Sequence, residues 1–234
     1  MREQHPTSLC RTIAQIDMWR GAVSLWLTTA IVAGCASSRA RTEVVRPASV
    51  PAAATIQTLY ESGEDREVVS RFRNSVADSS TPTARWFAAQ SQLRLGLRND
   101  AISDLTVLSQ SDGDPALRVA AQLAIGRLTN DEPMVIRAQA DAGAFPDNLF
   151  VQYELGLSYA VRNDFASAAR MFDGCIDTAP SFAYAYYRSG LAYQHLDRAD
   201  LMANRFDRFL RLAPNAPERA EVESVLRTIT TSRQ

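Results

Sequence analysis

The residues that could carry out chemistry are few in this chain of 234 residues. Of two histidines, only His195 lies outside the first 34 residues, and it stands beside Gln194 at the end of a predicted helix, where a surface histidine is the ordinary finding. No set of Cys, His and carboxylate residues has metal-ligand spacing, and we find no glycine-rich phosphate loop or nucleophile elbow. We therefore predict that the chain is not an enzyme and has no metal or cofactor.

The first 34 residues have the composition of an export signal. Arg2, Arg11 and Arg20 precede an uncharged segment, 21–34, which is 14 residues long. A membrane-spanning helix needs about 20 apolar residues, so this segment is too short. A charged lead, a short apolar core and small residues at the end predict a signal peptide over 1–34. The alternative is a buried helix, and Met18 is an alternative start of translation.

The end of this segment, Val32-Ala33-Gly34-Cys35, resembles the lipobox of bacterial lipoproteins. The resemblance implies cleavage before Cys35, a diacylglycerol on its thiol and, because Ala36 rather than Asp follows, the periplasmic face of the outer membrane. Residues 35–51 would form the lipidated cysteine and a flexible tether. Cleavage would also remove Cys10, leaving Cys175 unpaired, and we interpret Cys175 as a buried space-filling residue.

The rest of the chain contains a repeat. Four residues recur 34 positions later, as Gly156 and Gly190, Tyr159 and Tyr193, Phe172 and Phe206, and Pro180 and Pro214. This length and pattern, with Ala168 four residues before Phe172, resemble the tetratricopeptide repeat, or TPR. The second copy departs from the pattern, with Ser189 for Leu and Met202 for Ala. The resemblance implies an all-α fold, a right-handed superhelical solenoid of antiparallel helix pairs.

The physics of such a pair explains the repeated residues. Glycines fit where two helices approach closely, aromatic rings fill the space to the next helix, and prolines end the second helix. We expect Ser181 and Asp197 to cap the helices that follow them, and Thr81-Pro82 and Asp114-Pro115 to begin new units.

Carrying the register upstream predicts a solenoid over 52–216. In the second helix of each unit, the position equivalent to Ala168, where a small residue is typical, falls at Val68, Ala101, Val135, Ala168 and Met202. The aromatic position, equivalent to Phe172, falls at Phe72, Leu105, Gln139, Phe172 and Phe206. The five units are 49–81, 82–115, 116–148, 149–182 and 183–216. The first three are degenerate: Gln139 departs from the aromatic position, and Gly143 with Pro146 shortens a helix. Residues 217–234 would form a capping helix and tail, with Val222, Val225, Leu226 and Ile229 at helical spacing.

The first helices of a TPR solenoid line its concave face, which is the surface that such proteins use for binding. The inward residues by register are Trp86, Arg94, Arg127, Leu128, Phe150, Tyr153, Leu157, Tyr184, Tyr187, Gln194 and His195. Tyr, Trp and Arg dominate binding hot spots, so these residues form a candidate protein-binding groove. The alternative is that some of the rings only pack between adjacent first helices.

Composition narrows the function further. The formal net charge of −1 argues against a nucleic-acid partner, and no feature indicates a small-molecule substrate. The resemblance implies a lipid-anchored scaffold or adaptor that binds another envelope protein or peptide segment. Pilus and secretin biogenesis, β-barrel assembly and delivery of substrates to a protease all fit. The alternative is a non-catalytic accessory subunit of a cell-wall remodelling or peptidase complex.

Overall fold

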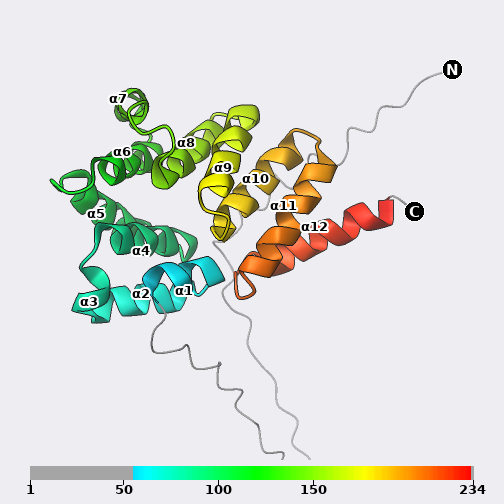
Figure 1. Cartoon of the computed structure of the whole chain (residues 1–234), viewed down its shortest axis with the longest axis horizontal. Helices are drawn as coiled ribbons and strands as arrows, with labels where there is room; N and C mark the ends of the chain where they lie inside the picture. Colours follow the sequence, from blue (N-terminus) through cyan, green and yellow to red (C-terminus); the bar gives the residue numbers. More distant parts are fainter. Residues whose placement is uncertain (1–54, 233–234) are drawn as a thin grey trace, which may run out of the picture. The chain divides into compact units, whose positions relative to one another are not determined.

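The structure, a computed structural model, describes residues 55–232 and the side chains of 55–228. The predicted signal peptide, Cys35 and the tether lie outside the described residues. Between residues 55 and 232 the chain forms twelve helices and no strand: α1 (Ile56–Ser62), α2 (Asp65–Asn74), α3 (Val76–Ser79), α4 (Pro82–Arg94), α5 (Arg98–Ser109), α6 (Pro115–Thr129), α7 (Glu132–Ala142), α8 (Leu149–Val161), α9 (Phe165–Thr178), α10 (Ala183–His195), α11 (Ala199–Leu212) and α12 (Arg219–Ser232) (Figure 1). None of these helices is both long and apolar enough to cross a membrane.

The helices form five antiparallel pairs, α1–α2, α4–α5, α6–α7, α8–α9 and α10–α11, and one such pair falls in each of the five predicted units. The fold is therefore the predicted all-α helical solenoid. One core of buried apolar residues runs along the first helices and most second helices, and α7 packs with α6 and the start of α8 in a second, smaller core.

Local sequence sets several helix starts. Thr81 Oγ1 accepts the backbone N–H of Ala84, and Asp114 accepts those of Ala116 and Leu117; in both cases a proline follows in the first turn. These two predicted caps are confirmed, because each side chain satisfies N–H groups that have no partner within the helix.

Two other predicted caps are wrong. Helix α10 begins after Phe182 and helix α11 after Arg198, and neither helix has a side-chain cap. Asp197 instead adopts a left-handed backbone conformation, with φ at 55°, in the turn between the helices of its pair. That turn needs a left-handed residue, which a short polar side chain tolerates, and this requirement displaces the cap.

Close helix crossings explain the repeated glycines. A Cβ at Gly156 would lie 2.6 Å from Phe172 Cε1, and a Cβ at Gly190 would lie 2.5 Å from Phe206 Cδ1. Both distances are far below van der Waals contact, so only glycine lets each ring of the second helix rest on the backbone of the first.

The third pair departs from the repeat. Helix α6 packs directly on α8, whereas α7 makes little contact with α8; the other second helices between α4 and α11 pack firmly against the next first helix. The α6–α7 crossing lies at Gly126, where a Cβ would be 2.8 Å from Val135 Cγ2. Repeat spacing would place the crossing at Gln122 or Leu123, so it has moved by one helical turn. In the aromatic position, Gln139 is only half-buried and accepts a hydrogen bond from Arg162.

The two ends of the array meet. Helix α1 contacts α10, and the turn between α11 and α12 lies beside the end of α1 (Figure 1). The backbone N–H of Asn215 donates to the carbonyl of Ser62 over 3.3 Å, and Asn215 Nδ2 donates to Glu64 Oε1 over 2.7 Å. Five pairs therefore close on themselves, and direct α6–α8 packing tightens the curve.

Candidate protein-binding surface

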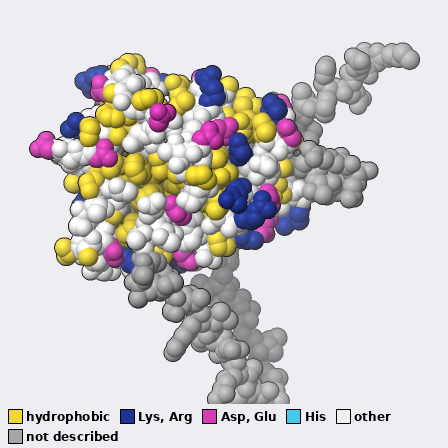
Figure 2. Space-filling model, viewed as in Figure 1, with side chains coloured by type: hydrophobic (Ala, Val, Ile, Leu, Met, Phe, Trp, Pro, Cys, Tyr) yellow, Lys and Arg dark blue, Asp and Glu magenta, His cyan; other side chains and the backbone are white. Residues whose placement is uncertain are grey.

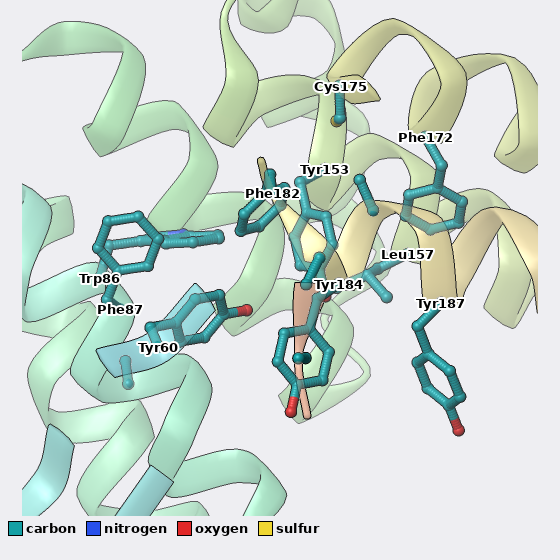
Figure 3. Packing of buried hydrophobic residues seen from close by; sticks show 14 of the residues in the cluster. Tyr60, Trp86, Phe87, Tyr153, Leu157, Phe172, Cys175, Phe182, Tyr184 and Tyr187 are labelled. Carbon is teal, nitrogen blue, oxygen red and sulfur yellow. The ribbon is translucent and has the colours of Figure 1, made fainter. Parts of the chain in front are cut away.

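Aromatic side chains from distant parts of the sequence meet on the inner side of the array. Trp86 on α4, Tyr153 on α8 and Tyr184 on α10 are at most 1% exposed. Figure 3 shows them packed with three rings that sequence reasoning missed: Tyr60, Phe87 and Phe182. The Trp86 and Tyr153 ring centroids are 5.6 Å apart, those of Tyr153 and Phe182 are 5.1 Å apart, and those of Tyr60 and Tyr184 are 5.3 Å apart. We call these six residues the aromatic cluster.

This arrangement corrects the prediction of an open aromatic groove. First-helix register does bring Trp86, Tyr153 and Tyr184 together, but α1 and neighbouring rings cover them. Tyr187 and Leu157 are also buried, at 7% and 8% exposed, as is Leu128. Rings of this size gain more from mutual burial than from exposure, because each removes a large apolar area from water. The aromatic cluster is therefore core in this structure, not an exposed surface.

The missed rings left only weak sequence signals. Tyr60 follows Ile56 and Leu59 at helical spacing, and Phe87 directly follows Trp86. Phe182 precedes its helix, in a position that no repeat column covers. Periodicity alone could have placed Tyr60 in a core but could not have paired it with residues more than 120 positions away.

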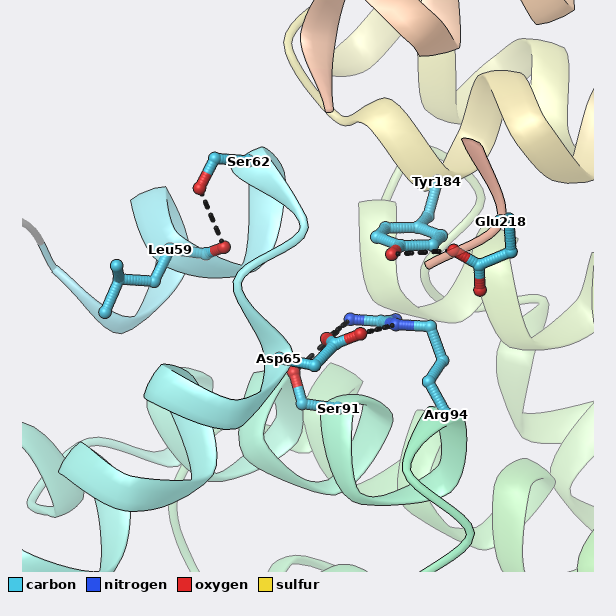
Figure 4. Close-up of polar contacts among 7 residues, drawn as sticks. All are labelled: Leu59, Ser62, Asp65, Ser91, Arg94, Tyr184 and Glu218. Carbon is cyan, nitrogen blue, oxygen red and sulfur yellow. Dashed lines mark hydrogen bonds and ion pairs between the residues drawn. The ribbon is translucent and has the colours of Figure 1, made fainter. Parts of the chain in front are cut away.

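Arg94 lies where the first and last units meet (Figure 4). Its guanidinium carbon is 3.8 Å from the centroid of the Tyr184 ring and 4.3 Å from that of Tyr60. Its Nε donates to Asp65 Oδ2 over 2.8 Å, and its terminal nitrogen pairs with the other carboxylate oxygen. Tyr184 completes the group by donating its hydroxyl to Glu218 Oε2 over 3.2 Å. Burial raises the pKa of the Tyr184 phenol. Arg94, predicted as a binding anchor, thus has its hydrogen-bonding and stacking partners within the chain.

A second polar group lies between α4, α6 and α8. Glu154 is fully buried and accepts hydrogen bonds from Arg127 over 2.9 Å and from Gln90 over 2.7 Å. Burial raises the pKa of Glu154, although Arg127 and Gln90 act in the opposite direction. The side chain of Arg127 remains 14% exposed, and its Nε has no hydrogen-bond partner among the described residues.

Arg188, which sequence reasoning missed, extends this group toward α10. Its guanidinium carbon lies 5.4 Å from the centroid of the Tyr187 ring, and its charge lowers the pKa of Glu154. Its Nε is buried and has no hydrogen-bond partner within residues 55–228. We call Arg127, Arg188, Glu154 and Gln90 the inner polar group.

The remaining predicted residues lie at the margins. Phe150 is half-buried, and its ring centroid is 4.9 Å from that of Trp86. Gln194 is half-buried, and His195 is exposed and stacks on Phe165 at 3.9 Å. His195 therefore stands apart from the aromatic cluster. Figure 2 shows apolar side chains gathered across the middle of the visible face, with acidic and basic side chains interspersed around them.

Cys175 and a surface hollow are two further features of chemical interest. The described residues contain no cluster of His, Cys, Asp or Glu suited to a metal ion. Cys175 is buried, its Sγ lies 3.6 Å from the carbonyl oxygen of Leu149, and burial raises the pKa of its thiol, which suppresses the reactive thiolate. A hollow of about 260 Å³ is lined by Phe72, Arg73, Gln92, Asp100, Ser103 and Asp104. Its charges are already paired, Arg73 with Asp100 and Arg85 with Asp104.

Comparison with known proteins supports the fold. No protein-family model and no curated protein matches the chain. Among solved structures, TTC0263, a thermophilic TPR protein of Thermus thermophilus, is 19% identical, with a TM-score of 0.50 over 73% of this chain and 95% of that one. YrrB, described as a TPR protein with an unusual peptide-binding site, is 13% identical, with a TM-score of 0.43 over 72% of this chain and 88% of that one. With the five helix pairs and the glycine crossings, the first match shows that residues 55–232 have the TPR fold.

Proposed function

We propose that this TPR chain is a protein-interaction scaffold of the bacterial cell envelope, held at the membrane by a lipid on Cys35. The observation that carries the scaffold role is the inner polar group. Arg127 and Arg188 each keep a buried Nε–H without a partner among the described residues, at the edge of an apolar inner wall. Both groups are closed to solvent in this structure, and a ligand acceptor that reached them on local opening would recover the free energy that an unpaired buried donor costs.

The geometry favours a protein segment that carries a carboxylate. Guanidinium groups bind carboxylates through charge-assisted hydrogen bonds, and the edge of the largely buried Tyr187 ring lies beside Arg188. Gln90 donates to Glu154, and Glu154 in turn accepts from Arg127 and holds it in place, so little side-chain entropy remains to be lost on binding. An Asp or Glu side chain, or a chain terminus, fits this chemistry.

Capture from solubilised envelopes tests the scaffold role. Arg188→Gln removes the charge while keeping much of the side-chain volume, and we expect it to weaken partner capture about tenfold. The variant should remain helical but melt at a lower temperature, because Arg188 also stabilises the charge of Glu154. Arg208→Gln, on the exposed surface of α11, is the matched control and should capture normally. Normal capture by both variants would remove the inner polar group from the binding site.

The identity of the captured protein decides between the pathways. Recovery of a secretin supports a role in pilus and secretin biogenesis, a barrel-assembly protein supports β-barrel insertion, and a peptidase supports an adaptor role. The second candidate function is a non-catalytic accessory subunit of a cell-wall remodelling or peptidase complex. Stoichiometric co-purification with such an enzyme, independent of Arg188, would favour that alternative.

The lipid anchor is supported by the sequence alone. Val32-Ala33-Gly34-Cys35 and the tether-like segment after it motivate the anchor, and Ala36 favours the periplasmic face of the outer membrane. Lipid attachment through two or more acyl chains gives stable membrane binding, because each buried methylene contributes about 0.8 kcal/mol.

A further inference from the structure

Helix α1 is an unusual first helix. It has 7 residues, whereas α4, α6, α8 and α10 have 13 to 15. Three of its residues, Ile56, Leu59 and Tyr60, are at most 3% exposed and lie at i, i+3 and i+4 spacing. This is the pattern of an amphipathic helix held in an apolar groove.

The place that α1 fills is the centre of the aromatic cluster. The Tyr60 centroid lies 4.8 Å from Phe87, 5.8 Å from Phe182 and 5.3 Å from Tyr184 (Figure 3). The Arg94 guanidinium lies between the rings of Tyr60 and Tyr184, an arrangement that we call the Arg94 sandwich. Helix α1 therefore covers rings that the first-helix register assigns to the binding side.

A small set of contacts fastens α1 at its C-terminal end. Gly63 has φ at +84°, and a Cβ there would lie 2.5 Å from the backbone nitrogen of Ala216. Asn215 adds its two hydrogen bonds to Ser62 and Glu64. We call Gly63, Glu64, Asn215 and Ala216 the latch.

Local release of α1 should cost less free energy than opening one of the longer helix pairs. A helix of seven residues is not stable by itself in water, so α1 depends on docking and on the latch. Segments with short elements and few ties open at a lower free energy than the core of a repeat array. Release would uncover Phe87, Phe182 and Tyr184 while leaving the pairs from α4 to α11 assembled.

We propose that the groove under α1, formed by Phe87, Arg94, Phe182 and Tyr184, is a helix-docking site that the chain fills with its own α1. The partner that it fits is an amphipathic helix with two aliphatic residues and an aromatic residue at i, i+3 and i+4. Such a helix displaces α1 when the latch opens. The biological use of this site rests on the proposed scaffold function; the docking itself does not.

A labelled peptide with the sequence of residues 55–64 tests the docking. Against the full chain, we expect Gly63→Ala to bind this peptide about tenfold more tightly than wild type, because the variant opens the latch and raises the fraction of binding-competent protein. Gly96→Ala is the matched control: Gly96 has φ at +76°, but a Cβ at this position would have no neighbouring atom within 4 Å, so the variant carries the same backbone strain without touching the latch. A peptide with Ala in place of Tyr60 should not bind.

Tryptophan quenching provides a second readout. In a background with Trp19→Phe and Trp26→Phe, Trp86 is the sole tryptophan and is fully buried. Acrylamide should quench Trp86 more strongly in Gly63→Ala, and in the milder Asn215→Ala, than in Gly96→Ala. Equal peptide binding and equal quenching in Gly63→Ala and Gly96→Ala would overturn the proposal, as would global loss of helicity in Asn215→Ala. Peptide docking with normal envelope capture by Arg188→Gln would instead refute only the proposed role of the inner polar group.

Discussion

Tyr184 and Tyr187 lie in different surroundings. Tyr184 is fully buried between Tyr60, Phe209 and the Arg94 guanidinium, and its hydroxyl reaches Glu218. Tyr187, one helical turn later, is 7% exposed and borders the inner polar group. Residue type suits both burial and binding, because a phenol has an apolar body and a polar tip.

Tyr184→Ala should therefore destabilise the fold. Truncation removes a fully buried ring and leaves a cavity. The free energy of unfolding should therefore fall by about 3–5 kcal/mol. Urea denaturation followed by circular dichroism measures the change. Tyr159→Ala, at a half-buried position, is the comparison and should cost less. Unchanged stability in Tyr184→Ala would mean that the ring is not core and would restore the open-groove interpretation.

Tyr187 should make stability depend on alkaline pH. Burial raises its pKa to about 12, against 10.0 for an exposed tyrosine. Because the folded state holds the proton more tightly, its contribution is complete below pH 10 and is lost as pH rises toward 12. Tyr187→Phe cannot ionise, so its free energy of unfolding should fall less over this interval, by up to about 1.4 kcal/mol per pH unit. Identical pH profiles for the variant and wild type would contradict burial of the hydroxyl.

At the scale of helices, the point where the two helices of a pair cross affects the curvature of the array. Gly156 and Gly190 place the α8–α9 and α10–α11 crossings in the same repeat position, against Phe172 and Phe206. In the third pair the crossing moves to Gly126, and α6 rather than α7 packs against α8. The polar Gln139 explains part of this change, because it cannot fill the apolar space that a phenylalanine fills in α9 and α11.

Gly126→Leu tests the shifted crossing. A leucine there would overlap Val135 and the carbonyl of Asp131, so we expect a loss of about 1–3 kcal/mol in stability despite the higher helix propensity of leucine. Gly113→Leu, at an exposed site where the nearest side-chain atom would be 3.8 Å from an added Cβ, should change the melting temperature little. Equal melting of the two variants would place the α6–α7 crossing elsewhere.

At the scale of the whole molecule, the meeting of the first and last helix pairs, which we call closure, and membrane attachment depend on different residues. Closure follows from contacts within residues 55–228: the latch, the Arg94 sandwich and the aromatic cluster. It determines which rings a partner can reach. Attachment depends on Cys35, and we propose it from the lipobox resemblance.

Cys35→Ser tests the anchor in cells. Serine lacks the thiol that would receive the lipid, so we expect loss of fatty-acid labelling and accumulation of uncut or soluble protein. Cys10→Ser is the matched control and should be labelled and cleaved as wild type. Unchanged labelling of the Cys35→Ser protein would refute the lipoprotein proposal.

The sequence alone determined the repeat and therefore the fold. Gly156, Tyr159 and Phe172 recur as Gly190, Tyr193 and Phe206, and such spacing predicts helix pairs because neighbouring units must bury the same side chains. Thr81-Pro82 and Asp114-Pro115 predicted helix starts for a local reason, since a cap satisfies N–H groups within its own turn. Register also brought Trp86, Tyr153 and Tyr184 to one side.

Only the tertiary structure decided whether the side that carries these three rings is exposed or buried. Periodicity shows which way a side chain faces relative to its own helix, but exposure depends on whether another segment covers it. Tyr60 covers Tyr184 across 124 residues, and Ala216 meets Gly63 across 153. Such contacts depend on the accumulated curvature of five pairs, including the shifted crossing at Gly126. No local pattern encodes that curvature. The structure therefore has a buried aromatic core where the sequence predicted an open groove, and the sequence did not identify Arg188 at the edge of that core.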